Sequence, residues 1–184
     1  MFDAVKAKLA RRSALKQVQR RTARAWTVEP TERRLLVVLP RGEEAREAWR
    51  FVKSLDLPAR QVVPVVLSGE VMTHVPAEYI SYLVRLEDGD TNLIGLPKRE
   101  FAQRVWGTNP DVALSLTSTF DPASAMLVGA SPAPFRIGFY DDEADPFFDL
   151  MVAPGPSPAS TYAALLEALR RISPPVLALD PAGS

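Results

Sequence analysis

Cysteine is absent from this chain of 184 residues. Its absence excludes disulfides, thiolate metal sites and a cysteine nucleophile, and it suits a reducing compartment. Histidine occurs once, at His74, so the sequence offers no histidine cluster. We expect His74 to be a surface residue, because it precedes Pro76 in a predicted loop and follows no nucleophile-elbow glycine pattern.

Long apolar runs are also absent. The longest, Leu35–Pro40 and Val62–Leu67, have the length of strands and are too short to span a bilayer. The N-terminus has no apolar stretch that would serve as a secretion signal. The sequence therefore predicts a cytoplasmic protein without a transmembrane segment.

Glycine-rich phosphate-binding motifs are missing as well. Neither G-x-G-x-x-G nor G-x-x-x-x-G-K-[ST] occurs, so the sequence indicates neither a dinucleotide nor a triphosphate, and we expect no cofactor. The acidic run Asp141–Asp145 has oxygen ligands suited to Mg²⁺ or Ca²⁺ but lacks the spacing of an EF-hand loop. We interpret it as a solvated acidic loop, and we expect no metal.

What is present is an alternation of apolar, strand-length runs with helical segments. The predicted helices cover residues 43–55, 97–105, 121–128 and 160–171, and the predicted strands cover 34–39, 61–67, 79–86, 111–116, 135–140 and 147–152, with 91–96 extending or pairing with the third strand. Continuous apolar strands are typical of sheets covered on both faces. The sequence predicts a Rossmann-like, three-layer α/β sandwich with a mostly parallel sheet of five or six strands. This domain spans residues 33–172, and 173–184 form a loose tail.

Parallel sheets bind ligands beyond the carboxyl ends of their strands. That rule selects the loops 40–44, 117–121, 141–146 and 153–158, and it gives a set of candidate ligand-binding residues: Arg41, Ser118, Asp121, Tyr140 and Asp141. Arg41 lies where a phosphate or carboxylate would be held, although an exposed arginine near Glu43 and Glu44 is the simpler interpretation. Asp121 would repel an anion, so we expect it to cap the following helix.

The first 26 residues form a predicted basic helical arm. Residues 1–25 hold eight Lys and Arg residues against Asp3 alone, a net charge of +7; since the whole chain is neutral, the remainder carries −7. Ser13 separates two apolar sets and is a possible cap for a second helix. The candidate partner-binding residues are Arg11, Arg12, Lys16, Arg20, Arg21 and Arg24.

Several hypotheses for this arm stay open. It docks on the acidic body of its own domain or of a second copy, touches nucleic acid through phosphates, or lies on an anionic membrane surface. A removable targeting segment is a further alternative, because the arm is rich in Arg and poor in acidic residues.

Residues 111–140 resemble part of the acceptor-side domain of heptosyltransferase-like glycosyltransferases, through a strand from Asp111, a small-residue helix over 123–130 and the run Arg136–Phe139. Those enzymes hold the nucleotide-sugar in a second Rossmann-like domain, which we do not expect after residue 172. Their first loop carries Gly-Asp, whereas this chain has Gly42-Glu43.

Over residues 80–170 the chain is more similar to a family of uncharacterised Bacteroidota proteins. The shared features are the basic N-terminal helix, the segment Asn92–Lys98, the following Asp-Val strand and the final run Phe148–Met151. This resemblance implies no known activity.

Two functions from different classes follow. The leading hypothesis is a non-catalytic interaction or ligand-binding module whose basic arm engages a partner, most simply another protein or a second copy. The alternative is an enzyme, or an enzyme subunit, acting on a phosphorylated or nucleotide ligand at the carboxyl-end loops. An enzyme should have a concave pocket at those loops, and an interaction protein should have an exposed apolar or basic patch elsewhere.

Overall fold

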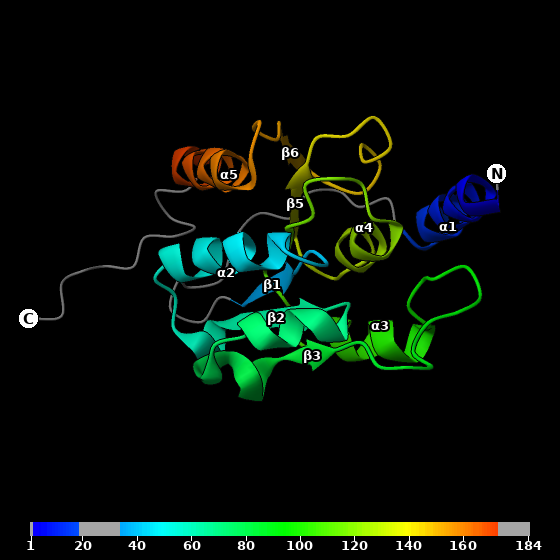
Figure 1. Ribbon diagram of the computed structural model, residues 1–184, viewed down its shortest axis with the longest axis horizontal. Coiled ribbons are helices and arrows are strands. Elements are labelled where there is room, and N and C mark those ends of the chain that lie inside the picture. Colours follow the sequence, from blue (N-terminus) through cyan, green and yellow to red (C-terminus); the bar gives the residue numbers. More distant parts are fainter. Residues whose placement is uncertain (1, 19–33, 173–184) are drawn as a thin grey trace, which may run out of the picture.

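The computed structural model of the chain describes residues 2–18 and 34–172. Six strands form one sheet: β1 (Leu35–Val38), β2 (Val62–Val66), β3 (Val84–Arg85), β4 (Val112–Ser115), β5 (Phe135–Phe139) and β6 (Leu150–Val152). All neighbouring strands are parallel, and their order is β3-β2-β1-β4-β5-β6 (Figure 1). This is the order of doubly wound Rossmann sheets, in which the topology switches between β1 and β4. The predicted fold class is confirmed.

Helices cover both faces of the sheet. One face carries α2 (Glu44–Ser54) and α5 (Pro158–Ile172), together with the 3₁₀ segments η3 (Gly69–His74) and η4 (Ala77–Tyr82). The other face carries α1 (Phe2–Gln17), α3 (Arg99–Trp106) and α4 (Pro122–Gly129). A further 3₁₀ turn, η2 (Ala59–Gln61), precedes β2. The result is a three-layer sandwich.

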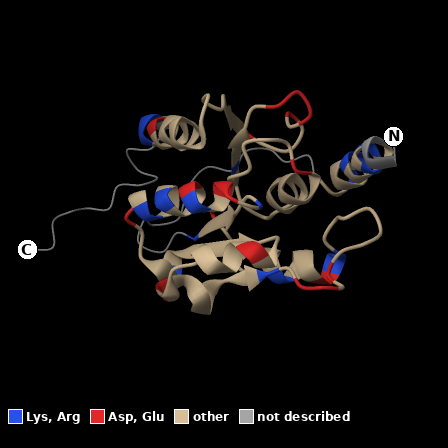
Figure 2. Cartoon of the chain, in the orientation of Figure 1, with Lys and Arg blue, Asp and Glu red and all other residues tan. Residues whose placement is uncertain are grey.

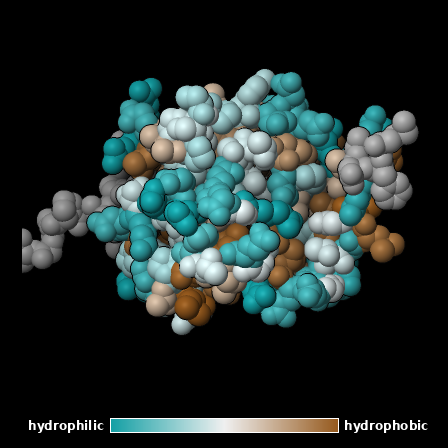
Figure 3. Space-filling view, in the orientation of Figure 1, coloured by the Kyte–Doolittle hydropathy of each residue, from teal (hydrophilic) through white to brown (hydrophobic). Residues whose placement is uncertain are grey.

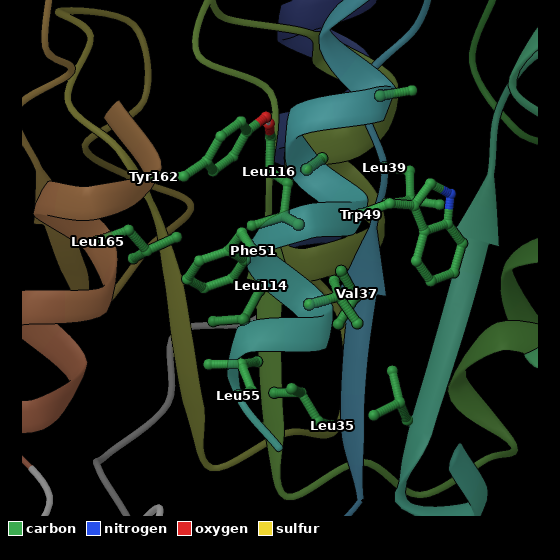
Figure 4. Close-up of a cluster of buried hydrophobic side chains, with 14 of the residues drawn as sticks. Leu35, Val37, Leu39, Trp49, Phe51, Leu55, Leu114, Leu116, Tyr162 and Leu165 are labelled. Carbon is green, nitrogen blue, oxygen red and sulfur yellow. Dashed lines mark hydrogen bonds between the residues drawn. The ribbon is translucent and has the colours of Figure 1, made fainter. Parts of the chain in front are cut away.

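The central strands are apolar along their whole length because both of their faces are buried. In β1, Leu35 and Val37 belong to the core beneath α2 and α5, whereas Leu36 and Val38 belong to the core beneath α3 and α4. Figure 4 shows side chains of β1 and β4 meeting those of α2 and α5. Each fully buried side chain of this kind contributes about 1.5–3 kcal/mol to stability.

Three local expectations were wrong. Residues 2–17 form one helix that continues through Ser13, so no second helix begins there, and residues 19–26 of the predicted arm lie outside the described residues. Residues 91–96 form a loop and not a strand, because the Asn92 side chain accepts hydrogen bonds from within the loop and Gly95 takes a φ of +83°. Within the predicted strand 79–86, η4 replaces the first part and β3 keeps only two residues. The predicted tail, 173–184, lies outside the described residues.

Candidate functional site

The switch point between β1 and β4 brings together residues that lie far apart in the sequence. Arg41 follows β1, while Ser118 and Asp121 follow β4, and the guanidinium Nε of Arg41 lies 3.3 Å from Oδ2 of Asp121. Arg41 also donates to the carbonyl of Leu67, which follows β2, at 3.1 Å. All five predicted ligand-binding residues lie at the carboxyl edge of the parallel sheet, as the rule on carboxyl-end loops predicts, and three of them lie at the switch point.

Asp121 caps α4. Its Oδ1 accepts hydrogen bonds from the backbone N–H groups of Ala123 at 2.7 Å and Ser124 at 3.0 Å, and Pro122 fills the first helical position. Proline is favoured there because its missing N–H would have no partner in the helix. The capping role predicted for Asp121 is confirmed, and a carboxylate of the chain itself occupies the N-terminus of α4.

Glu44 lies in the first turn of α2, whose N-terminus no described side chain caps, and its carboxylate is directed to the loop after β4 and to α5. Its Oε1 accepts a hydrogen bond from the backbone N–H of Ser118 at 3.2 Å and lies 3.1 Å from the hydroxyl of Tyr162 in α5. That hydroxyl also donates to the carbonyl of Leu116 at 2.6 Å. Burial raises the pKa of Tyr162 above its ordinary value, and the negative charge of Glu44 raises it further. Sequence reasoning missed Glu44 and Tyr162 as members of this network.

These contacts decide what the switch point can do chemically. In Rossmann sheets an anionic ligand uses the N–H groups and the dipole at a helix N-terminus. At α4 the carboxylate of Asp121 already accepts from these N–H groups, so an anion there would have to displace it. Glu44 accepts from the N–H of Ser118 in the loop after β4 and from the hydroxyl of Tyr162. A small pocket of about 270 Å³ is lined by Asp121, Arg41 and Lys6 of α1 among others. Ser118, Tyr140 and Asp141 do not line it.

Tyr140 and Asp141 follow β5 and belong to the acidic loop. Tyr140 is 54% exposed, and its hydroxyl donates to Oδ1 of Asp142 at 3.1 Å, a hydrogen bond that raises the pKa of Tyr140. Asp141 accepts from the backbone N–H of Glu143 at 2.9 Å. Within residues 2–18 and 34–172, no three His, Cys, Asp or Glu side chains are placed to hold a metal ion.

Another hollow, of about 820 Å³, lies at the opposite, amino end of the sheet. On the β3 side, β2 is paired only at Val65 and Val66, so the start of β2 has β1 as a neighbour but no strand on its other edge. Arg34 and Arg60 line this hollow, but the guanidinium of Arg34 donates to the carbonyl of Thr108 at 3.0 Å. None of the predicted site residues lies there.

The described part of the predicted basic arm, α1, packs on its own domain. Ala10 and Ala14 of α1 are buried against α4, and Nε of Arg11 lies 3.3 Å from Oε2 of Glu143 in the acidic loop. Figure 2 shows the Lys and Arg residues of α1 and the Asp and Glu residues of the loop between β5 and β6. Arg12 and Lys16 are exposed. The other predicted partner-binding residues, Arg20, Arg21 and Arg24, lie outside the described residues.

Next to α1, the loop between β3 and α3 exposes an apolar residue that sequence reasoning did not single out. Leu93 is 98% exposed, the highest value among the large exposed hydrophobic residues. Its neighbour Ile94 lines a groove of about 720 Å³ against α1. Figure 3 shows hydrophobic residues gathered at this end of the molecule. We call the surface the docking face and define it as Leu9, Arg12, Leu15, Lys16, Leu93 and Ile94.

Comparisons with family models, with curated proteins and with solved structures find no match to this chain. In the part of the chain that the structure describes, no helix is both long and apolar enough to cross a membrane.

Proposed function

We propose that this chain is a non-catalytic interaction module of the cytoplasm, whose docking face engages an acidic protein partner. The observation that carries the proposal is Leu93, which is 98% exposed at one end of the molecule beside an exposed, cationic helix. Contiguous exposed apolar patches rimmed by polar residues mark interaction surfaces. Leu9 and Leu15 of α1 add to the apolar part, at 49% and 38% exposure.

The charge of the docking face supports an acidic partner. Among the described residues, Arg11 has an ion-pair partner in Glu143, but Arg12 and Lys16 form no ion pair. Unpaired cations on one face speed the encounter with a negatively charged partner and disfavour a positively charged one. The polar network at the switch point supports the same proposal, because Asp121 already accepts from the N–H groups at the start of α4 and Glu44 accepts from the N–H of Ser118.

The test is capture of partners from a native lysate of the source cells, in the presence of nuclease. The variant is Arg12→Glu with Lys16→Glu, and the matched control is Arg46→Glu with Lys53→Glu, two exposed cations of α2 on the other face of the sheet. Substitution is preferable to deletion of α1, since deletion would uncover the surface of α4 that Ala10 and Ala14 bury. We expect one protein to be retained by the unmodified chain and by the control but lost by the variant.

Two results would contradict the proposal. If the variant and the unmodified chain retain the same proteins, the cations of the docking face have no part in binding. If the retained material disappears on nuclease treatment, the arm binds nucleic acid.

A second candidate is an enzyme or enzyme subunit that takes a phosphorylated or nucleotide ligand. The observation that favours it is the pocket of about 270 Å³ in which Lys6 and Arg41 provide two cations. Calorimetric titration with ADP tests it: heat of binding that Arg41→Ala abolishes supports this candidate, and no heat with the unmodified chain rejects it for this ligand class.

A further inference from the structure

The loop that carries Leu93 is held in one conformation by its own hydrogen bonds. The Asn92 side chain accepts from the backbone N–H groups of Ile94 and Leu96, each at 3.1 Å, and the Asn92 N–H donates to the Leu96 carbonyl at 2.9 Å. A bridge between Thr91 and Pro97 closes the base of the loop. Gly95 permits the turn with its positive φ.

Because the loop is already ordered, Leu93 can bind a partner without a further cost of ordering the loop. Ordering a loop on association costs free energy, so a loop that is already ordered retains more of the gain from burying its apolar residue. Leu93 is 98% exposed in the isolated chain, and nearly its whole side chain is therefore open to a partner.

The groove next to Leu93 is concave and has apolar walls. Its lining comes from Leu9, Leu15 and Ser13 of α1 and from Ile94 of the loop, while Arg12 and Lys16 line it with positive charge. Its volume of about 720 Å³ leaves room for more than one side chain. An amphipathic helix presents apolar side chains to such a groove at i, i+3, i+4 and i+7, and its flanking residues face the rim.

We infer that this groove receives an acidic amphipathic helix of the partner protein, whose apolar residues pack on Leu9, Ile94 and Leu93 and whose carboxylates pair with Arg12 and Lys16. The inference rests on the proposed function and names the partner's chemistry.

Two other classes of macromolecule fit these residues less well. The docking face carries no aromatic side chain on which bases would stack, and nucleic-acid phosphates do not fill an apolar groove. A membrane surface takes up apolar groups that protrude together, whereas Leu9 and Ile94 line a hollow. A peptide helix fills the hollow and meets the cations at the same time.

The test begins with a phage-displayed library of helical peptides, about 18 residues or five turns long, randomised on all faces and selected on the full chain. We expect the enriched sequences to be acidic and to have apolar residues at helical spacing. Fluorescence anisotropy then measures the affinity of an enriched peptide for variants of the chain.

The expected pattern separates apolar from charged contacts. Leu9→Ser, Ile94→Ser and Leu93→Ser should each raise the Kd about tenfold, and Arg12→Glu with Lys16→Glu should raise it further. Two matched controls should leave the Kd unchanged: Ile80→Ser, which alters an exposed isoleucine of η4, and Arg46→Glu with Lys53→Glu on α2. Circular dichroism of each variant confirms that it is folded.

Several results would overturn the inference. One is a selection without acidic amphipathic sequences; another is an enriched peptide that binds the three serine variants as tightly as the unmodified chain. If partner capture from the lysate still depends on Arg12 and Lys16, the proposed function survives, and only the assignment of the groove to an acidic helix is wrong.

Alternative occupants give their own results, each of which also contradicts the inference. In the first, phosphatidylserine vesicles or single-stranded RNA bind with dependence on Leu9 and Ile94 while no peptide does. In the second, light scattering shows a dimer of the chain that Leu93→Ser abolishes.

Discussion

Two regions of this molecule contain similar kinds of residues but differ in whether those residues have partners within the chain. At the carboxyl end of the sheet, Arg41 is paired with Asp121, and Glu44 accepts from two donors. On the docking face, Arg12 and Lys16 have no ion pair among the described residues, and Leu93 lies almost entirely in solvent. At the place where Rossmann sheets usually bind ligands, the chain's own side chains bond to one another. The residues without such partners are those of the docking face.

The difference shows why position in a fold does not by itself assign a function. A switch point offers helix N-termini and loop backbone, but each group can be used by only one partner. In this chain Asp121 uses the N-terminus of α4, and Glu44 uses the backbone N–H of Ser118. Substitutions at the switch point should therefore change stability and leave partner binding intact, and substitutions on the docking face should do the reverse.

Tyr162→Ala should have the largest effect on stability. It removes a buried ring that lies 5.7 Å from the ring of Phe51 and 5.9 Å from that of Phe139, measured between centroids. The cavity and the lost packing should cost about 3–5 kcal/mol in the free energy of unfolding, measured by urea denaturation. Tyr82→Ala, at a 41% exposed tyrosine, is the control and should cost much less. Equal costs would mean that the switch-point network does not stabilise the fold.

Asp121→Ala should come next, at about 1–2 kcal/mol, because α4 loses its N-cap. Asp121→Asn keeps an acceptor for the N–H groups of Ala123 and Ser124 but loses the charge opposite Arg41. The asparagine variant should therefore be nearly as stable as the unmodified chain in the same urea titration. A large loss in Asp121→Asn would assign the effect to the ion pair and not to the cap.

Tyr162→Phe should have a smaller effect that depends on pH. The pKa of Tyr162 is raised in the folded chain, whereas in the unfolded chain it stays near 10.0. The neutral hydroxyl thus contributes its full stability, about 1 kcal/mol, below about pH 10, and this contribution falls as the pH rises further. Urea titrations from about pH 8 to about pH 11 should show the gap between the unmodified chain and Tyr162→Phe closing. A gap that is constant with pH would contradict the raised pKa.

Leu93→Ser should have the smallest effect on stability, within about 0.5 kcal/mol, because the side chain has almost no contacts to lose. Instead, Leu93→Ser should reduce the amount of partner that the chain captures. Ile80→Ser is the matched control, with an isoleucine 56% exposed on the opposite side of the sheet from α1. If Leu93→Ser lowers stability but leaves partner capture unchanged, the docking face has a structural role and not a binding role.

Much of the fold could be predicted from local patterns. The apolar runs at Leu35–Val38 and Val62–Val66 predict strands buried on both faces, and Asp121-Pro122 predicts the start of α4. The loop that holds Leu93 was the clearest failure. Its apolar residues favoured a strand, and the pairing of the Asn92 side chain with its own loop overrode that preference.

The candidate site could be predicted only in part. The carboxyl-end rule correctly placed Arg41, Ser118 and Asp121 at one edge, because it follows from strand direction alone. The rule does not say which groups are already paired. Tyr162 and Glu44 are separated by 118 residues, and no local pattern indicates that they meet.

The sequence by itself determined the layered α/β architecture, the helix cap and the charge of the arm, because these depend on residue type and on spacing along a few turns or strands. Only the tertiary structure decided that Glu44 and Asp121 fill the switch point, that Ala10 and Ala14 seat α1 on α4, and that Leu93 stays exposed. Burial and pairing depend on what the rest of the chain places against a residue, and that is a property of the whole fold.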